Sequence, residues 1–96
     1  MAGPIMKLAA KLSPEQIVAI IDTREQLPLD LSPLASIRGT LQTGDYSVRG
    51  LENVVAIERK SLDDLLACCG RERDRFEKEI QRLVAYPVRA LVIEAS

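Results

Sequence analysis

Hydrophobic residues in this 96-residue chain gather in short blocks that are separated by charged or turn-forming residues. Residues 17–21 (IVAII) are apolar and mostly β-branched, which is typical of a buried strand, and residues 88–94 have the same character. Residues 45–49 and 54–59 flank a Gly-Leu-Glu-Asn turn and predict a hairpin. The expected strands therefore lie at residues 17–21, 37–41, 45–49, 54–59 and 88–94.

Two helices are expected between the fourth and fifth strands. Ser61 is a suitable N-cap for the first helix, and Gly70 marks a break. The second helix runs from about residue 71 to residue 85, and its apolar positions recur at helical spacing. These positions are Phe76, Ile80, Leu83 and Val84. The order is roughly β-β-β-β-α-β, which predicts an α/β fold with a mixed sheet flanked by helices.

Composition narrows the class of protein. Hydrophobic residues make up 47% and charged residues 28%, an ordinary globular balance, and no apolar run approaches the roughly 20 residues that span a bilayer. The N-terminus lacks the apolar core of a secretory signal, so we expect an intracellular protein without a membrane partner. The net charge of −1 gives no support to DNA binding, although a local basic stripe would suffice for it.

Candidate chemistry is limited by the absence of histidine. This absence excludes histidine triads and zinc–imidazole sites. Cys68 and Cys69 are adjacent, so they form either buried thiols or a strained vicinal disulfide, and neither arrangement joins distant segments. Any acid–base or metal chemistry must therefore use carboxylates and lysine.

Three carboxylates lie at strand ends, where they can meet at one edge of the sheet. Asp22 follows the first strand, Asp45 begins the third, and Glu58 ends the fourth, two residues before Lys60 on the same strand face. Oxygen-only ligands suit Mg²⁺ or Mn²⁺, and Lys60 would partly neutralise the cluster and hold an attacking water. The alternative is that each group is a strand-end charge facing solvent.

Basic residues follow one face of the second helix. Arg71, Arg75, Lys78 and Arg82 fall within a narrow sector, and Arg73 lies nearer the apolar side, where it could point toward the active end of the sheet. They form either a phosphate-contacting stripe or ion pairs with the acids that flank them.

The spacing of these residues resembles that of a known family. The segments DTRE (22–25), GDY (44–46) and ERKSLDD (58–64) resemble the GD…ERKxxxD signature of the XPF-family nuclease domain, which belongs to the PD-(D/E)XK superfamily. The resemblance covers residues 17 to 94 and implies a restriction-endonuclease-like sheet. It also implies a structure-specific DNA endonuclease that cleaves at branched, flap or fork junctions in DNA repair or recombination.

The resemblance assigns a role to each motif residue. Asp22, Asp45 and Glu58 would bind Mg²⁺ or Mn²⁺, and Lys60 would assist the water. Supporting and substrate-binding roles fall to further residues: Arg24, Arg59, Arg71 and Arg73 for phosphate, and Glu25 and Asp64 in support. Asp64 also fits a helix start capped by Ser61, a role that is compatible with the first.

Domain organisation follows from the same resemblance. Residues 1–16 are expected to be an N-terminal extension and residues 17–96 an XPF-type domain in a truncated or minimal version. A shortened sheet exposes apolar surface, so we expect a homodimer or heterodimer through this domain, in the nucleus or in the cytoplasm and nucleoid. The rival hypothesis is a catalytically inactive DNA-binding or dimerisation module with the same fold. A third is another nucleic-acid substrate for the same chemistry.

Overall fold

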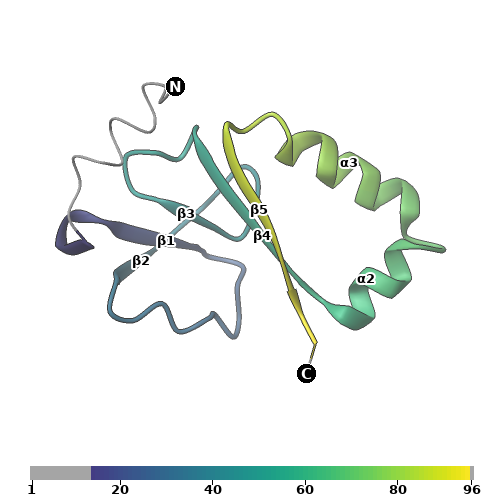
Figure 1. Cartoon of the computed structure of the whole chain (residues 1–96), viewed down its shortest axis with the longest axis horizontal. Helices are drawn as coiled ribbons and strands as arrows, with labels where there is room; N and C mark the ends of the chain where they lie inside the picture. The colour runs from purple at the N-terminus through teal and green to yellow at the C-terminus, as the bar shows by residue number, and fades with distance from the viewer. Residues whose placement is uncertain (1–13, 96) are drawn as a thin grey trace.

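A computed structural model describes residues 14–95 of the chain and contains one five-stranded mixed sheet with two helices. The strand order is β2-β1-β3-β4-β5 (Figure 1). The strands are β1 (Val18–Asp22), β2 (Ala35–Gly39), β3 (Tyr46–Val48), β4 (Val55–Ser61) and β5 (Val88–Glu94). The outer pairs β1–β2 and β4–β5 are parallel, whereas β3 pairs antiparallel with both of its neighbours. The predicted α/β class is confirmed.

The core lies along the centre of the sheet. In β1, Ala19, Ile20 and Ile21 are buried, as the apolar run predicts. The predicted hairpin is also present, and Tyr46 on β3 is buried opposite Ile57 on β4. Burial of this apolar surface is the main force that holds the central strands together.

The two helices connect β4 to β5 and lie together beside these strands, away from β1 and β2 (Figure 1). The first is α2 (Leu62–Cys68), and the Ser61 hydroxyl at its N-cap accepts a hydrogen bond from the Asp64 N–H at 3.1 Å. Predicted capping by Ser61 is therefore confirmed. The second is α3 (Arg73–Leu83), which the chain enters after a turn through Gly70.

Three sequence expectations about burial or position need correction. The predicted bounds of β5 are confirmed, but the prediction that it is buried is wrong. It is an edge strand, and Val88 and Ile93 are exposed. Val84 is likewise exposed, because α3 ends at Leu83 before the apolar stripe reaches it. The second strand begins two residues earlier than expected, at Ala35.

Smaller features complete the description. Of the expected N-terminal extension, Pro14–Gln16 form a single 3₁₀ turn, and residues 1–13 lie outside the described residues. Both cysteines are free thiols; Cys68 is buried, whereas Cys69 is exposed, contrary to the expectation of two buried thiols.

Across residues 14–95, neither helix has the length and apolar character needed to cross a membrane.

Candidate functional site

The strand register places the three candidate carboxylates on one face of the sheet. Ile21 pairs with Tyr46, and Tyr46 pairs with Ile57, so the next positions along the ladder align Asp22, Asp45 and Glu58. Backbone hydrogen bonds continue this alignment, from the Asp22 N–H to the Asp45 carbonyl (2.8 Å) and from the Asp45 N–H to the Ile57 carbonyl (2.7 Å). Residues opposite one another in neighbouring strands project to the same side. The sheet itself therefore brings the three acids together.

Gly44 makes this alignment sterically feasible. Its φ of +83° lies in the left-handed region, where a side chain is unfavourable. A Cβ at this position would also come within 3.0 Å of the Ile57 carbonyl oxygen. The chain can thus turn tightly against β4 and present Asp45 beside Glu58 only because residue 44 lacks a side chain.

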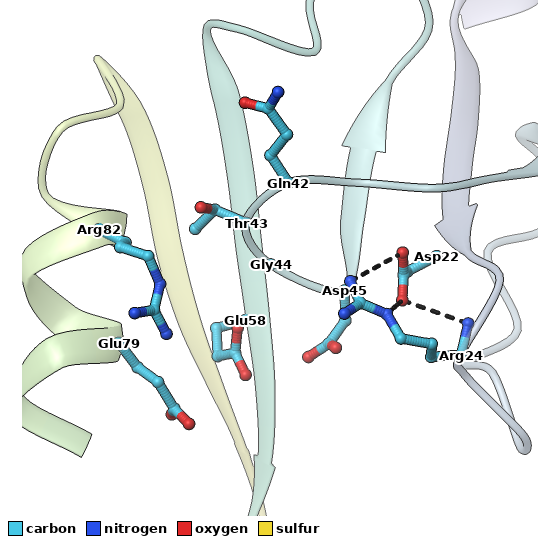
Figure 2. A pocket seen from close by; sticks show the side chains of 9 residues that line it. All are labelled: Asp22, Arg24, Gln42, Thr43, Gly44, Asp45, Glu58, Glu79 and Arg82. Carbon is cyan, nitrogen blue, oxygen red and sulfur yellow. Dashed lines mark hydrogen bonds and ion pairs between the residues drawn. The ribbon is translucent and has the colours of Figure 1, made fainter. Parts of the chain in front are cut away.

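The carboxylates line a cavity of about 280 Å³ between the sheet and α3 (Figure 2). Glycine and polar side chains from the 42–44 loop form one wall, and α3 contributes the opposite wall. The lining residues are Asp22, Arg24, Gln42, Thr43, Gly44, Asp45, Glu58, Glu79 and Arg82.

The side chain of Asp22 is fully buried, and its carboxylate forms an ion pair with Arg24. The guanidinium of Arg24 donates to both carboxylate oxygens, from Nε at 2.7 Å and from Nη2 at 3.3 Å (Figure 2). The backbone N–H of Leu41 donates a further bond at 2.9 Å. Burial alone would raise the pKa of Asp22, but these hydrogen bonds lower it below its ordinary value. Asp22 is therefore an ionised carboxylate whose positively charged partner is the Arg24 guanidinium.

Asp45 and Glu58 lie close enough to share a proton. Burial, followed by the charge of Asp45, raises the pKa of Glu58 to about 7, and a hydrogen bond between the two side chains contributes. Burial also raises the pKa of Asp45, although the Arg59 backbone N–H, 2.8 Å from Asp45 Oδ2, opposes the rise. Since two like charges repel in a poorly solvated site, Glu58 keeps its proton until the pH approaches its pKa of about 7.

Lys60 projects from the same strand face as Glu58 but is directed at α3. Its side chain is only 9% exposed, and its Nζ lies 3.4 Å from Glu79 Oε2 and 5.4 Å from the centre of the Phe76 ring. Burial would lower the pKa of Lys60, but nearby negative groups, with Glu79 the foremost, together outweigh burial and raise it. The lysine is therefore a buried ammonium ion that contacts the cavity-lining Glu79 and the ring of Phe76 on α3, although it does not itself line the cavity.

Glu25 and Arg59 lie on the opposite face of the sheet. Arg59 pairs with Glu94 and donates to Glu25 Oε2 at 3.1 Å, and Glu25 also accepts from the Tyr46 hydroxyl at 3.0 Å. Arg59 further donates to the Leu27 carbonyl. Glu25 thus pairs with Arg59, and its expected supporting role at the site remains a prediction. Arg59, by contrast, is committed to protein groups away from the carboxylate cavity, because side chains alternate along β4.

The remaining predicted residues are separated from the cavity. Arg73 is exposed and pairs with Glu77 at 3.0 Å, near the start of α3, rather than pointing at the carboxylates. Arg71 is exposed in the preceding turn, and Asp64 is exposed in the first turn of α2. Of the expected basic stripe, Arg82 alone reaches the cavity wall.

The donor atoms suit a hard divalent cation in chemistry, although they are not assembled as ligands. All available donors are oxygens, and a cation could replace the proton that Glu58 and Asp45 share. Within residues 14–95, however, no three acidic or cysteine side chains are grouped closely enough to form a metal site. Arg24 would have to leave Asp22 for that residue to join Asp45 and Glu58 around an ion.

Sequence reasoning missed Glu79 as part of the site. Its acidic neighbours on α3 favoured an interpretation as surface ion pairs, and Glu79 does lie 3.6 Å from Arg75. A signal was nevertheless present: Glu79 is three residues after Phe76 and four before Leu83, within the stripe that faces the sheet. An acid within an inward-facing stripe requires a partner, and Lys60 is that partner.

Comparison with known proteins identifies no relative: no family model, curated protein or solved structure matches this chain.

Proposed function

We propose that this chain is a metal-dependent nuclease of the XPF type that hydrolyses DNA phosphodiester bonds at branched, flap or fork junctions, in the compartment that holds the DNA. The observation that carries the proposal is the strand register, which aligns Asp22, Asp45 and Glu58 on one face of the sheet beside a cavity. These are the carboxylates of the motifs that resemble the XPF signature.

The motif residues in and beside the cavity have distinct roles in this proposal. Asp45 and Glu58 would hold Mg²⁺ or Mn²⁺, and Asp22 would join them once Arg24 moves away. A bound divalent ion supplies a more acidic water and stabilises negative charge on a phosphoryl oxygen. The Lys60 ammonium would orient the attacking water. Arg24, with a side chain that is 71% exposed, would be free to contact a phosphate.

Cleavage assays with matched variants test the proposal. We expect the full chain to cleave flap, fork or splayed-arm DNA with Mg²⁺ or Mn²⁺, and to lose about 100-fold or more of this activity in Asp45→Asn or Lys60→Ala, because each change removes a group that acts on the ion or the water. The controls Asp63→Asn and Lys78→Ala alter exposed residues outside the cavity and should retain activity.

The outcomes of this assay are separable. Undiminished cleavage in both site variants would reject the assignment of the site. A preference for plain duplex ends or for RNA would retain the chemistry and reject the junction substrate, so the substrate panel includes both.

One arrangement favours a second candidate function, a nuclease-like DNA-binding or dimerisation module without activity. Asp22 is already paired with Arg24, and Lys60 with Glu79, so the charged groups are satisfied without a metal ion. Titration calorimetry with Mn²⁺ distinguishes the two candidates. Heat of binding that disappears in Asp45→Asn supports the nuclease, whereas the absence of any binding supports the inactive module.

A further inference from the structure

The α3 residue Glu79 is the cavity-lining carboxylate to which the expected chemistry gives no task. It comes from a helix, whereas the other three acids come from the sheet or its strand ends. In Figure 2 its side chain extends from α3 toward Glu58. Its charge also contributes to the raised pKa of Glu58, so Glu79 and Glu58 are electrostatically coupled.

Glu79 is held in an unfavourable setting that needs an explanation. Its Oε2 is buried and, among the described residues, accepts no aligned hydrogen bond. A buried carboxylate oxygen in this condition is costly unless a nearby charge offsets the cost. The Lys60 Nζ, 3.4 Å away, is that charge.

Lys60 in turn depends on α3 for its placement. Its ammonium is almost completely buried and contacts two α3 side chains one helical turn apart, Glu79 and Phe76. Phe76 offers a ring face, which attracts a cation but does not fix its position closely. The carboxylate of Glu79 provides the directional contact.

We propose that Glu79 is a positioning residue that fixes the Lys60 ammonium beside the carboxylate cavity. The inference rests on the proposed function for its catalytic consequence, whereas the placement of Lys60 can be tested without any DNA. Glu79 would thus make the active arrangement depend on the docking of α3 against β4.

The first test measures the accessibility of lysine. The full chain is treated with an amine-acylating reagent, and the modification of each lysine is followed by peptide mass spectrometry. We expect Lys60 to react slowly in the natural chain and several-fold faster in Glu79→Gln, which removes the charge but keeps the size. The exposed Lys78 serves as an internal standard.

Two further variants make this measurement specific. Glu79→Asp keeps the charge and should restore part of the protection of Lys60. Glu77→Gln alters an exposed acid on the same helix that pairs with Arg73 instead, and should leave Lys60 unchanged. Equal reactivity of Lys60 in the natural chain and in Glu79→Gln overturns the inference.

The second test measures turnover. Because a misplaced group can cost about 100-fold in rate, we expect Glu79→Gln to lower kcat by about 10- to 100-fold while KM stays the same. An unchanged or increased kcat would mean that Glu79 does not position Lys60 productively, and would overturn the inference. If the natural chain cleaves no DNA but Lys60 loses protection in Glu79→Gln, the proposed function fails and the positioning of Lys60 by Glu79 is supported.

Discussion

The surroundings of Glu58 raise its pKa to about 7, first through burial and then through nearby negative charges. Glu58 is placed beside Asp45 by the strand ladder, and α3 adds the negative charge of Glu79. A carboxyl group in such a site retains its proton up to a pH near 7, as two nearby carboxylates seldom ionise together. The same crowding gives a cation a favourable place to bind, because the cation relieves the repulsion that the proton otherwise relieves.

The raised pKa of Glu58 predicts a pH dependence of stability in the absence of metal. The folded chain retains a proton on Glu58 between pH 4.5 and about 7, whereas the unfolded chain has released it. The free energy of unfolding should therefore fall by about 1 to 3 kcal/mol as the pH rises through this window. Urea unfolding with a chelator present, at pH 5 and pH 8, measures the difference.

The variant Glu58→Gln removes this titration and should be more stable than the natural chain at pH 8, with little difference at pH 5. Glu52→Gln, at an exposed turn position, is the control and should keep the natural pH dependence. If Glu58→Gln kept the full dependence of the natural chain, the loss of stability would belong to another group.

At the scale of elements, the turn into β3 determines where Asp45 lies. Gly44 and Gly50 both have positive φ, of 83° and 87°, but only Gly44 packs against another strand. Comparison of the two glycines therefore distinguishes the cost of a positive φ, which both share, from the cost of a close contact, which only Gly44 has.

Alanine substitutions at the two positions should differ. Gly50→Ala meets no atom within 4 Å and should cost about 1 kcal/mol, from its φ alone. Gly44→Ala adds a Cβ contact of 3.0 Å with the Ile57 carbonyl oxygen and should cost roughly 2 to 4 kcal/mol. Urea unfolding of both variants measures these values, and equal losses would show that the contact with β4 is relieved easily.

The same scale shows what the sequence could predict. The presence of the strands and their succession along the chain were accessible because short β-branched runs and a hairpin turn carry strong local signals. The helix start at Ser61 followed from capping chemistry. The exposure of β5 was not accessible, because an apolar run has the same composition at the centre of a sheet and at its edge. That distinction depends on which elements cover the strand.

Site residues divide in a similar way. The carboxylates Asp22, Asp45 and Glu58 could be placed at one sheet edge from their positions beside apolar runs. Arg59 and Glu79 could be assigned only from geometry. Arg59 lies on the far face by strand alternation, and the role of Glu79 depends on the angle at which α3 docks.

For the whole molecule, α2 and the edge strand β5 each carry two exposed apolar side chains. Leu62 and Leu66 lie one turn apart on α2 and are both exposed, as are Val88 and Ile93 on the edge strand β5. Exposed apolar surface beside an unpaired strand edge favours association. This agrees with the expectation of a dimer, which remains a prediction.

Solution scattering over a range of concentrations tests that prediction. We expect the natural chain to associate as concentration rises, and Leu66→Glu to shift it toward the monomer because a charge would have to be buried in the interface. Leu27→Glu places the same charge on an exposed apolar residue of the loop between β1 and β2, outside α2 and β5, and should have no effect. A natural chain that stays monomeric at high concentration would contradict the prediction.

The alternation of side chains along β4 restricts which insertions and deletions this strand can accept during evolution. The even-numbered positions Glu58 and Lys60 face the cavity and α3 respectively, on one side of the sheet, and the odd-numbered Arg59 faces the opposite side. Loss of one residue from the strand before Glu58 would exchange these two faces, whereas loss of two would preserve them. Insertions or deletions in β4 before Glu58 therefore preserve both faces only when they involve an even number of residues. Other changes of length are confined to the loops.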